Sequence, residues 1–112
     1  MITTGQDLFN TIVTGLANQG WQRSYDTRLH LCRYRGPDKM RCAVGMVIPD
    51  EAYEPAMEDL PLDRVLTSCG IHEDNLSLLM SCQGAHDAGT NPTTMKRLFQ
   101  QVAHEYELEW PL

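Results

Sequence analysis

Two cysteines on either side of a turn sequence are the first residues whose types and spacing could do chemistry. Cys32 and Cys42 flank the residues Gly-Pro-Asp-Lys at positions 36–39, where glycine and proline favour a reversal of the chain. In a hairpin with a three-residue turn the two cysteines face each other. Opposed Cβ atoms lie about 4.5–5.5 Å apart, which is near but above the usual disulfide spacing. The pattern therefore allows a redox pair, and the alternative is that both are small hydrophobic core residues.

Two Cys–His pairs further along the chain have a loose zinc-ligand spacing. His72 lies three positions after Cys69, and His86 lies four positions after Cys82. Cysteine and histidine both bind zinc. Cys82 and His86 would share one face of a helix, whereas Cys69 and His72 fall near helix ends. The metal site is therefore kept as an alternative. The main expectation is a buried Cys82, hydrogen-bonded or exposed histidines and no cofactor.

His86 also precedes Asp87, and a carboxylate beside an imidazole can fix its tautomer for general-base catalysis. Adjacent helical residues point about 100° apart and rarely pair with each other. The alternative is that His86 bonds to the backbone or packs beneath the hairpin. Neither a glycine-rich phosphate loop nor a serine in a strained elbow occurs. The sequence leaves enzymatic activity uncertain, leaning against it, and predicts no catalytic residue.

Charge is segregated along the chain, whose formal net charge is −6. Six of the nine basic residues lie between positions 23 and 41. Residues 50–63, called the acidic segment below, contain no Lys or Arg and six carboxylates: Asp50, Glu51, Glu54, Glu58, Asp59 and Asp63. Their spacing matches no cation-binding loop. We expect them to bind a partner, and the alternative is that the basic and acidic segments partly pair with each other.

The elements that must position these residues are mostly helical. Apolar residues at helical spacing predict a first helix from a cap at Thr3 or Thr4 to a stop at Gly20. Shorter helices are predicted from about 61 to 69, before Gly70, and over 73–87. A last helix opens at Asn91, which is followed by a proline.

The remaining element is a β-hairpin, predicted over about residues 29–44 from the alternation on each side of the turn. Residues 43–48 could continue its second strand or form a short buried helix, and the sequence leaves both open. Together these elements predict a single α+β domain over residues 1–112, mostly helical, with one hairpin packed on three to five helices.

Residues 32–53 carry a resemblance to a known family. They read CRYRGPD at 32–38, RCAVG at 41–45 and IPDE at 48–51, followed by Tyr53. This block resembles a family of small proteins of bacteriophage and prophage genomes to which no activity is assigned. The match extends in outline to QGAHD at 83–87 and to the last helix. Lys39 and Met40 depart from the glycine-containing turn of the family, and Cys69 and Cys82 lie outside the match.

The resemblance implies a phage origin, and small acidic phage proteins often occupy a surface of a host protein. We therefore expect a host-protein partner, bound through the acidic segment in imitation of a phosphate backbone. The target would be a nucleic-acid-binding or defence factor that the protein inhibits. The negative charge disfavours direct nucleic-acid binding.

Location and assembly complete the expectations. No apolar run approaches the roughly 20 residues of a membrane-spanning helix, and no secretory signal is visible. The expected compartment is the cytoplasm of the bacterial host. The alternatives to host-protein binding are a metal protein or enzyme centred on His86, and a homo-oligomeric structural or regulatory module that associates through an apolar patch of Trp21, Trp110 and Leu112.

Overall fold

The first helix of the computed structural model, which describes residues 4–112, begins and ends where the sequence predicts. Helix α1 (Gly5–Asn18) is capped by Thr4, whose hydroxyl oxygen accepts a hydrogen bond from the Asp7 N–H over 3.0 Å. The alternative cap, Thr3, lies outside the described residues. Gly20 follows the helix at φ 74°, a left-handed conformation that glycine adopts at low cost. The buried face consists of Leu8, Phe9, Ile12, Val13 and Leu16.

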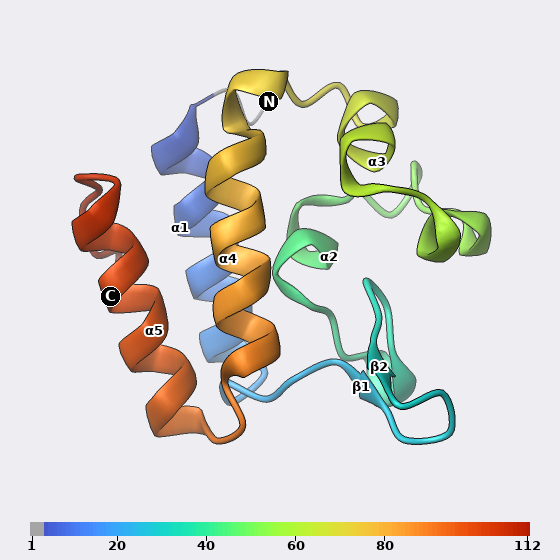
Figure 1. The fold of residues 1–112 in the computed structure, drawn as a ribbon, viewed down its shortest axis with the longest axis horizontal. Coiled ribbons are helices and arrows are strands. Elements are labelled where there is room, and N and C mark those ends of the chain that lie inside the picture. The colour runs from blue at the N-terminus through green and yellow to red at the C-terminus, as the bar shows by residue number, and fades with distance from the viewer. Residues whose placement is uncertain (1–3) are drawn as a thin grey trace.

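Helix α4 (Leu76–Ala88) lies at the centre of the molecule, with α1 behind it and α5 (Pro92–Glu105) beside it (Figure 1). Helix α5 begins as predicted, because the Asn91 side chain accepts a hydrogen bond from the Thr94 N–H over 2.9 Å and a proline occupies the first turn. Phe9 and Phe99 meet between α1 and α5 with ring centroids 6.5 Å apart. The core lies among these three helices and the short helix α2 (Ala43–Val47), whose buried residues pack against α1 and α4.

On the other side of α4 lie the hairpin and the short helix α2 (Figure 1). Strands β1 (Tyr25–Asp26) and β2 (Leu31–Cys32) pair antiparallel, and they confirm the α+β class with one hairpin. The hairpin lies within residues 25–32 rather than 29–44. The Asp26 carboxylate fixes this earlier turn, since it accepts hydrogen bonds from the Arg28 N–H over 2.9 Å and the Leu29 N–H over 3.3 Å.

The predicted second half of the hairpin forms only an isolated bridge between Arg35 and Arg41, around the 3₁₀ turn η1 (Pro37–Lys39). After it the chain forms helix α2 (Ala43–Val47), which settles the choice left open for residues 43–48. Cys42 caps this helix through its sulfur, 3.3 Å from the Gly45 nitrogen. Cys32 therefore faces Tyr25 rather than Cys42, and both cysteines are free thiols. The expected opposition of the two cysteines was wrong.

Three further short helices connect α2 to α4: the 3₁₀ turn η2 (Pro55–Asp59), helix α3 (Leu62–Ser68) and the 3₁₀ turn η3 (Glu73–Asn75). Pro55 begins η2 and Pro61 immediately precedes α3, positions at which the missing N–H of proline costs no helical hydrogen bond. Gly70 ends α3 at φ 73°. The acidic segment therefore spans the irregular connection between α2 and the first turn of α3.

The two tryptophans proposed as part of an exposed apolar patch instead close one end of the core. Trp21 and Trp110 stack with centroids 6.2 Å apart, and each also contacts a core phenylalanine. Of the three residues proposed for the patch, Leu112 is exposed. Within residues 4–112, no helix combines the length and the apolar character needed to cross a bilayer.

Gly45 provides a test of the close packing between α2 and the residues before η1. A Cβ atom at this position would overlap the carbonyl oxygen of Tyr34, which is backbone and has little room to move. We expect Gly45→Ala to lower the free energy of unfolding by about 2–4 kcal/mol. In Gly84→Ala, by contrast, the new methyl group meets open space within α4, and we expect a gain of about 0.5–1 kcal/mol. Urea unfolding of both variants checks this, and a neutral Gly45→Ala would contradict the packing.

Candidate functional site

Glu58 belongs to the acidic segment but serves the interior of the fold. Its side chain is only 10% exposed. One carboxylate oxygen accepts a hydrogen bond from the Tyr34 N–H over 2.9 Å, and the other accepts from the Arg35 N–H over 3.1 Å and the Tyr53 hydroxyl over 2.6 Å. Burial, followed by this bond to Glu58, raises the pKa of Tyr53 to about 12. Glu58 therefore accepts the N–H groups of residues 34 and 35, which the bridge between Arg35 and Arg41 leaves without a backbone acceptor.

Asp50 makes a second connection between the basic and acidic segments. Its carboxylate lies 2.7 Å from the Arg35 guanidinium and 2.8 Å from that of Arg41. The charge of Arg41, then the bond to Arg35, lower the pKa of Asp50. Arg35 also lies over the Tyr53 ring, 4.5 Å from its centroid, and donates to the Ile48 carbonyl over 3.1 Å. Glu58 in turn lies 3.8 Å from the Arg33 guanidinium. For Asp50 and Glu58, the expected alternative of internal charge pairing is therefore what the structure shows.

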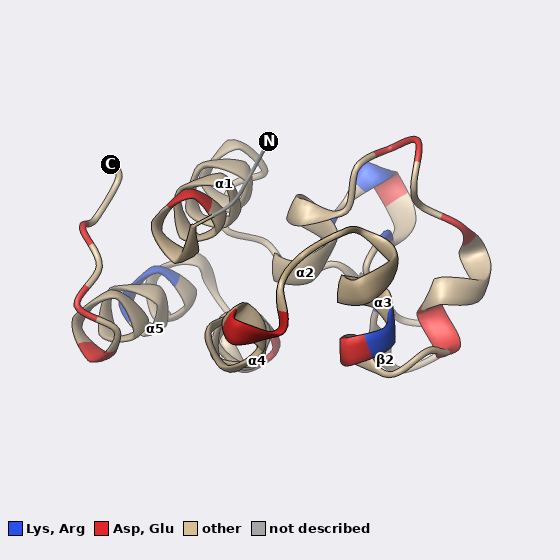
Figure 2. Ribbon diagram, turned by 90° about the horizontal axis from the view of Figure 1, so that it is seen from above, with Lys and Arg blue, Asp and Glu red and all other residues tan. Residues whose placement is uncertain are grey.

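The other four acids of the segment remain exposed. Glu51, Glu54, Asp59 and Asp63 form no ion pair with any Lys or Arg of residues 4–112. Figure 2 shows acidic residues along the connection from α2 to α3, on the side of the molecule away from α5 and the C-terminus. The candidate interface thus contains four of the six carboxylates that the sequence singles out, and we call these four the exposed acids.

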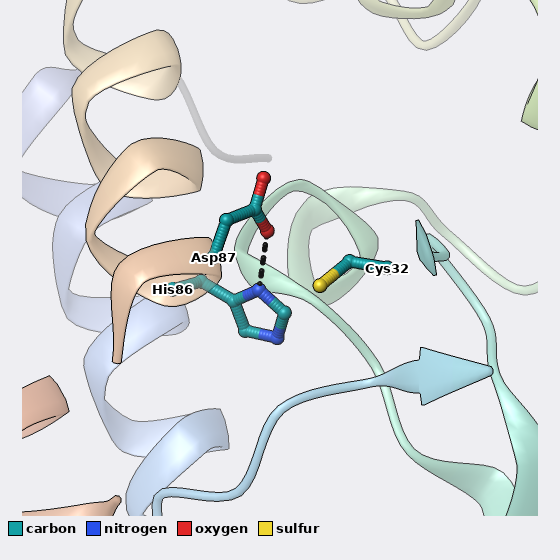
Figure 3. A group of neighbouring side chains, drawn as sticks. All are labelled: Cys32, His86 and Asp87. Carbon is teal, nitrogen blue, oxygen red and sulfur yellow. Dashed lines mark hydrogen bonds and ion pairs between the residues drawn. The ribbon is translucent and has the colours of Figure 1, made fainter. Parts of the chain in front are cut away.

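His86 and Asp87 lie at the end of α4 and pair with each other, although the sequence argument considered this pairing rare. The His86 Nδ1 and an Asp87 carboxylate oxygen are 2.8 Å apart (Figure 3). The other ring nitrogen, Nε2, accepts a hydrogen bond from the Ser24 N–H over 3.0 Å. Because Nε2 is an acceptor, the neutral ring carries its proton on Nδ1, where it bonds to Asp87. Both nitrogens of this fully buried ring are therefore occupied.

Cys32 is the third member of this group, and the sequence did not connect it to His86. Its sulfur, a His86 ring nitrogen and an Asp87 oxygen all lie within 4.8 Å of one another. Burial is the largest cause that raises the pKa of Cys32 to about 11, and the negative charge of Asp87 is the next. The thiol consequently stays protonated at neutral pH. It is neither an activated nucleophile nor a partner of a free imidazole base.

A metal ion at this group would require a rearrangement. Nδ1 can bind a metal only if its proton moves to Nε2, and the buried Ser24 N–H then loses its acceptor, at a cost of about 1–3 kcal/mol. The present bonds instead link segments of the fold. Gln83 donates to Asp87 over 2.8 Å and accepts from the Val44 N–H of α2 over 3.1 Å. The residues QGAHD of the resemblance thus tie α2 and residue 24 to α4.

The zinc-type set proposed from spacing does not converge. Within residues 4–112, the group of ligand-type side chains around His86 that is close enough to hold one metal ion contains neither Cys69, His72 nor Cys82. Cys82 is buried in α4, where burial raises its pKa to about 12. The exposed His72 instead caps η3 by accepting from the Asp74 N–H over 3.1 Å. Spacing along the chain alone could not show that Cys69, His72 and Cys82 lie outside the group around His86.

Comparisons of the chain with protein-family models, with curated proteins and with solved structures find no match. The functional inference therefore depends on the exposed acids and the geometry around them.

The internal role of Glu58 is testable against an exposed acid of the same segment. Glu58→Gln replaces the carboxylate that accepts hydrogen bonds from two backbone N–H groups and a hydroxyl. We expect the free energy of unfolding to fall by about 1–3 kcal/mol. Glu51→Gln changes an exposed side chain and is expected to stay within about 0.5 kcal/mol of the wild type. Urea unfolding at pH 7 distinguishes them, and equal effects would show that Glu58 is no more structural than Glu51.

Cys32 gives a pH-dependent prediction. Because its pKa is about 11 against an ordinary value of 9.0, we expect alkylation by iodoacetamide at pH 8 to be roughly 100-fold slower than that of a free thiol. The rate should rise with pH until about 11. Asp87→Asn removes a negative charge that raises this pKa, so the rate at pH 8 should increase about threefold to tenfold.

Cys69 is the matched control, because burial alone raises its pKa. Its alkylation rate should not respond to Asp87→Asn. Peptide mapping by mass spectrometry measures both cysteines in one sample. If Cys32 were labelled as fast as a free thiol at pH 8, the raised pKa of Cys32 would be contradicted.

Proposed function

We propose that this protein acts by binding a basic surface of a host protein through the exposed acids Glu51, Glu54, Asp59 and Asp63. The observation that carries the proposal is that these four carboxylates stay unpaired within residues 4–112, while the arginines that reach the acidic segment pair with Asp50 and Glu58. Internal structure accounts for Asp50 and Glu58 and does not account for the other four. Unpaired charge of one sign raises the association rate with an oppositely charged surface.

A surface built to bind nucleic acid is the partner class that fits such a group. Four carboxylates on one connecting segment resemble a phosphate backbone in charge, and a protein that covers a phosphate-binding surface inhibits it. The resemblance to phage and prophage proteins favours a nucleic-acid-binding or defence factor of the bacterial host. Binding of this kind is sensitive to salt, because exposed charges more than about 8–10 Å apart are screened at physiological ionic strength.

The alternative centred on His86 receives less support from the geometry. Both ring nitrogens of His86 are hydrogen-bonded, and the adjacent thiol has a raised pKa. Catalysis by this group would require His86 to lose a hydrogen bond and the Cys32 thiol to lose its proton.

Charge reversal tests the proposal. In Glu54→Lys/Asp59→Lys both substitutions fall on the exposed acids, and Glu58 is left intact because its loss would disturb the fold. Glu105→Lys/Glu109→Lys changes the net charge by the same amount, at exposed positions near the C-terminus. We expect recovery of a basic partner from host lysate to fall at least tenfold for the first variant and to remain within twofold for the second.

The wild-type complex should weaken between 50 and 300 mM salt. Circular dichroism of each variant confirms that the fold is intact. Recovery that survives the first reversal, or that falls equally in both variants, would contradict a specific role of the exposed acids.

A further inference from the structure

Two hollows share Ile71, which lies in the connection from α3 to η3. The larger, of about 430 Å³, is lined by residues of α1, α2 and the end of α3: Leu8, Val47, Pro49, Glu51, Cys69, Gly70 and Ile71. The smaller, of about 200 Å³, is lined by Asp63, Leu66, Thr67, Ile71, Glu73 and Leu76. Ile71 lines both hollows, so the two adjoin at this side chain.

The turn after α3 holds this side chain in place. The Ile71 N–H donates to the Leu66 carbonyl over 3.0 Å, and Gly70 adopts φ 73° to allow the chain to turn back. Ile71 is partly buried against the core, so its side chain is fixed at its base and reachable at its edge. A rigid apolar side chain can recognise a partner with little loss of conformational entropy.

The charges around the two hollows are all negative. Glu51 lines the larger hollow, and Asp63 and Glu73 line the smaller, while none of the residues lining either one is a Lys or Arg. Two of these acids, Glu51 and Asp63, belong to the exposed acids. Another hollow, lined by Arg35, Lys39, Met40 and Arg41, has the opposite charge. The larger hollow is mainly apolar, whereas apolar and polar side chains line the smaller one in similar measure. Such a lining fits aliphatic side chains that are accompanied by basic ones.

We propose that the two hollows receive aliphatic side chains of a basic amphipathic segment of the partner, one in each hollow beside Ile71. Lys or Arg residues of that segment would face Glu51, Asp63 and Glu73. Segments of this type bind apolar grooves through side chains spaced three or four residues apart. The inference rests on the proposed function and narrows the partner from a basic surface to a basic segment with aliphatic residues. Acidic steering then sets the rate of association, and the hollows supply the specificity.

Two synthetic peptides of equal length and charge test this inference, one built from Lys and Leu in an amphipathic helical pattern and the other with Ser in place of Leu. Fluorescence anisotropy at 150 mM NaCl measures the affinity of each. We expect the wild-type protein to bind the Lys/Leu peptide at least tenfold more tightly than the Lys/Ser peptide. Ile71→Ser should remove most of this preference, and Asp63→Asn/Glu73→Gln should weaken both peptides.

Met80→Ser is the matched apolar control, since Met80 is 58% exposed on α4 and lines neither hollow. Glu105→Gln/Glu109→Gln is the matched charge control, since it removes two exposed negative charges that line neither hollow. Neither should change the preference by more than twofold. Chemical-shift mapping on the wild-type protein gives a result independent of the folding of Ile71→Ser. The Lys/Leu peptide should shift the amide signals of Gly70, Ile71 and Leu76 and leave those of α5 unchanged.

The outcomes separate the two proposals. Equal affinity for both peptides, or shifts that map elsewhere, would overturn the groove. If the binding is then still lost in Glu54→Lys/Asp59→Lys, the acidic surface stands without the groove. If neither peptide binds at low salt, both proposals are overturned.

Discussion

The fold depends on side chains of its helices that satisfy the backbone of residues 24–44. Within residues 4–112, only four residues form regular strand pairs, so most N–H groups of residues 24–44 have no sheet partner. The Ser24 N–H bonds to His86, the N–H groups of residues 34 and 35 bond to Glu58, and those of residues 41 and 44 bond to Gln19 and Gln83. Because unsatisfied buried N–H groups are costly, these side chains fix where the chain runs.

This constraint explains why residues that look like a catalytic or metal-binding group serve as hydrogen-bonding partners of the backbone. A buried histidine, a neighbouring carboxylate and a thiol suggest a catalytic or metal site when only residue types are considered. In the structure the histidine accepts a backbone N–H and the carboxylate holds the imidazole and Gln83, so both are used as hydrogen-bonding groups of the fold. Glu58 is used in the same way, because its largely buried carboxylate accepts hydrogen bonds from the backbone. Function is better sought among polar groups that the fold leaves unused.

Features that depend on neighbouring residues could be predicted from the sequence. The start of α5 at Asn91 and the glycine stop at Gly70 each depend on a few adjacent residues and were predicted correctly. The cap at Thr4 is likewise local, and Thr4 was one of the two caps predicted. The hairpin was displaced because Asp26 offers a local turn that competes with the Gly-Pro-Asp turn. The pairing of Glu58 with residues 34 and 35 and the approach of Cys32 to His86 join positions 23 to 54 apart. No local pattern encodes such contacts.

The internal and external roles of the acidic segment support each other. A connection with little regular structure would ordinarily order its side chains only on binding, which weakens an interface. Here the bonds of Glu58 to the backbone of residues 34 and 35, and of Asp50 to Arg35 and Arg41, hold the segment at both ends of its irregular part. The acids between and beside them are therefore presented from a fixed backbone. Two carboxylates used for structure leave the other four arranged in advance for the proposed partner.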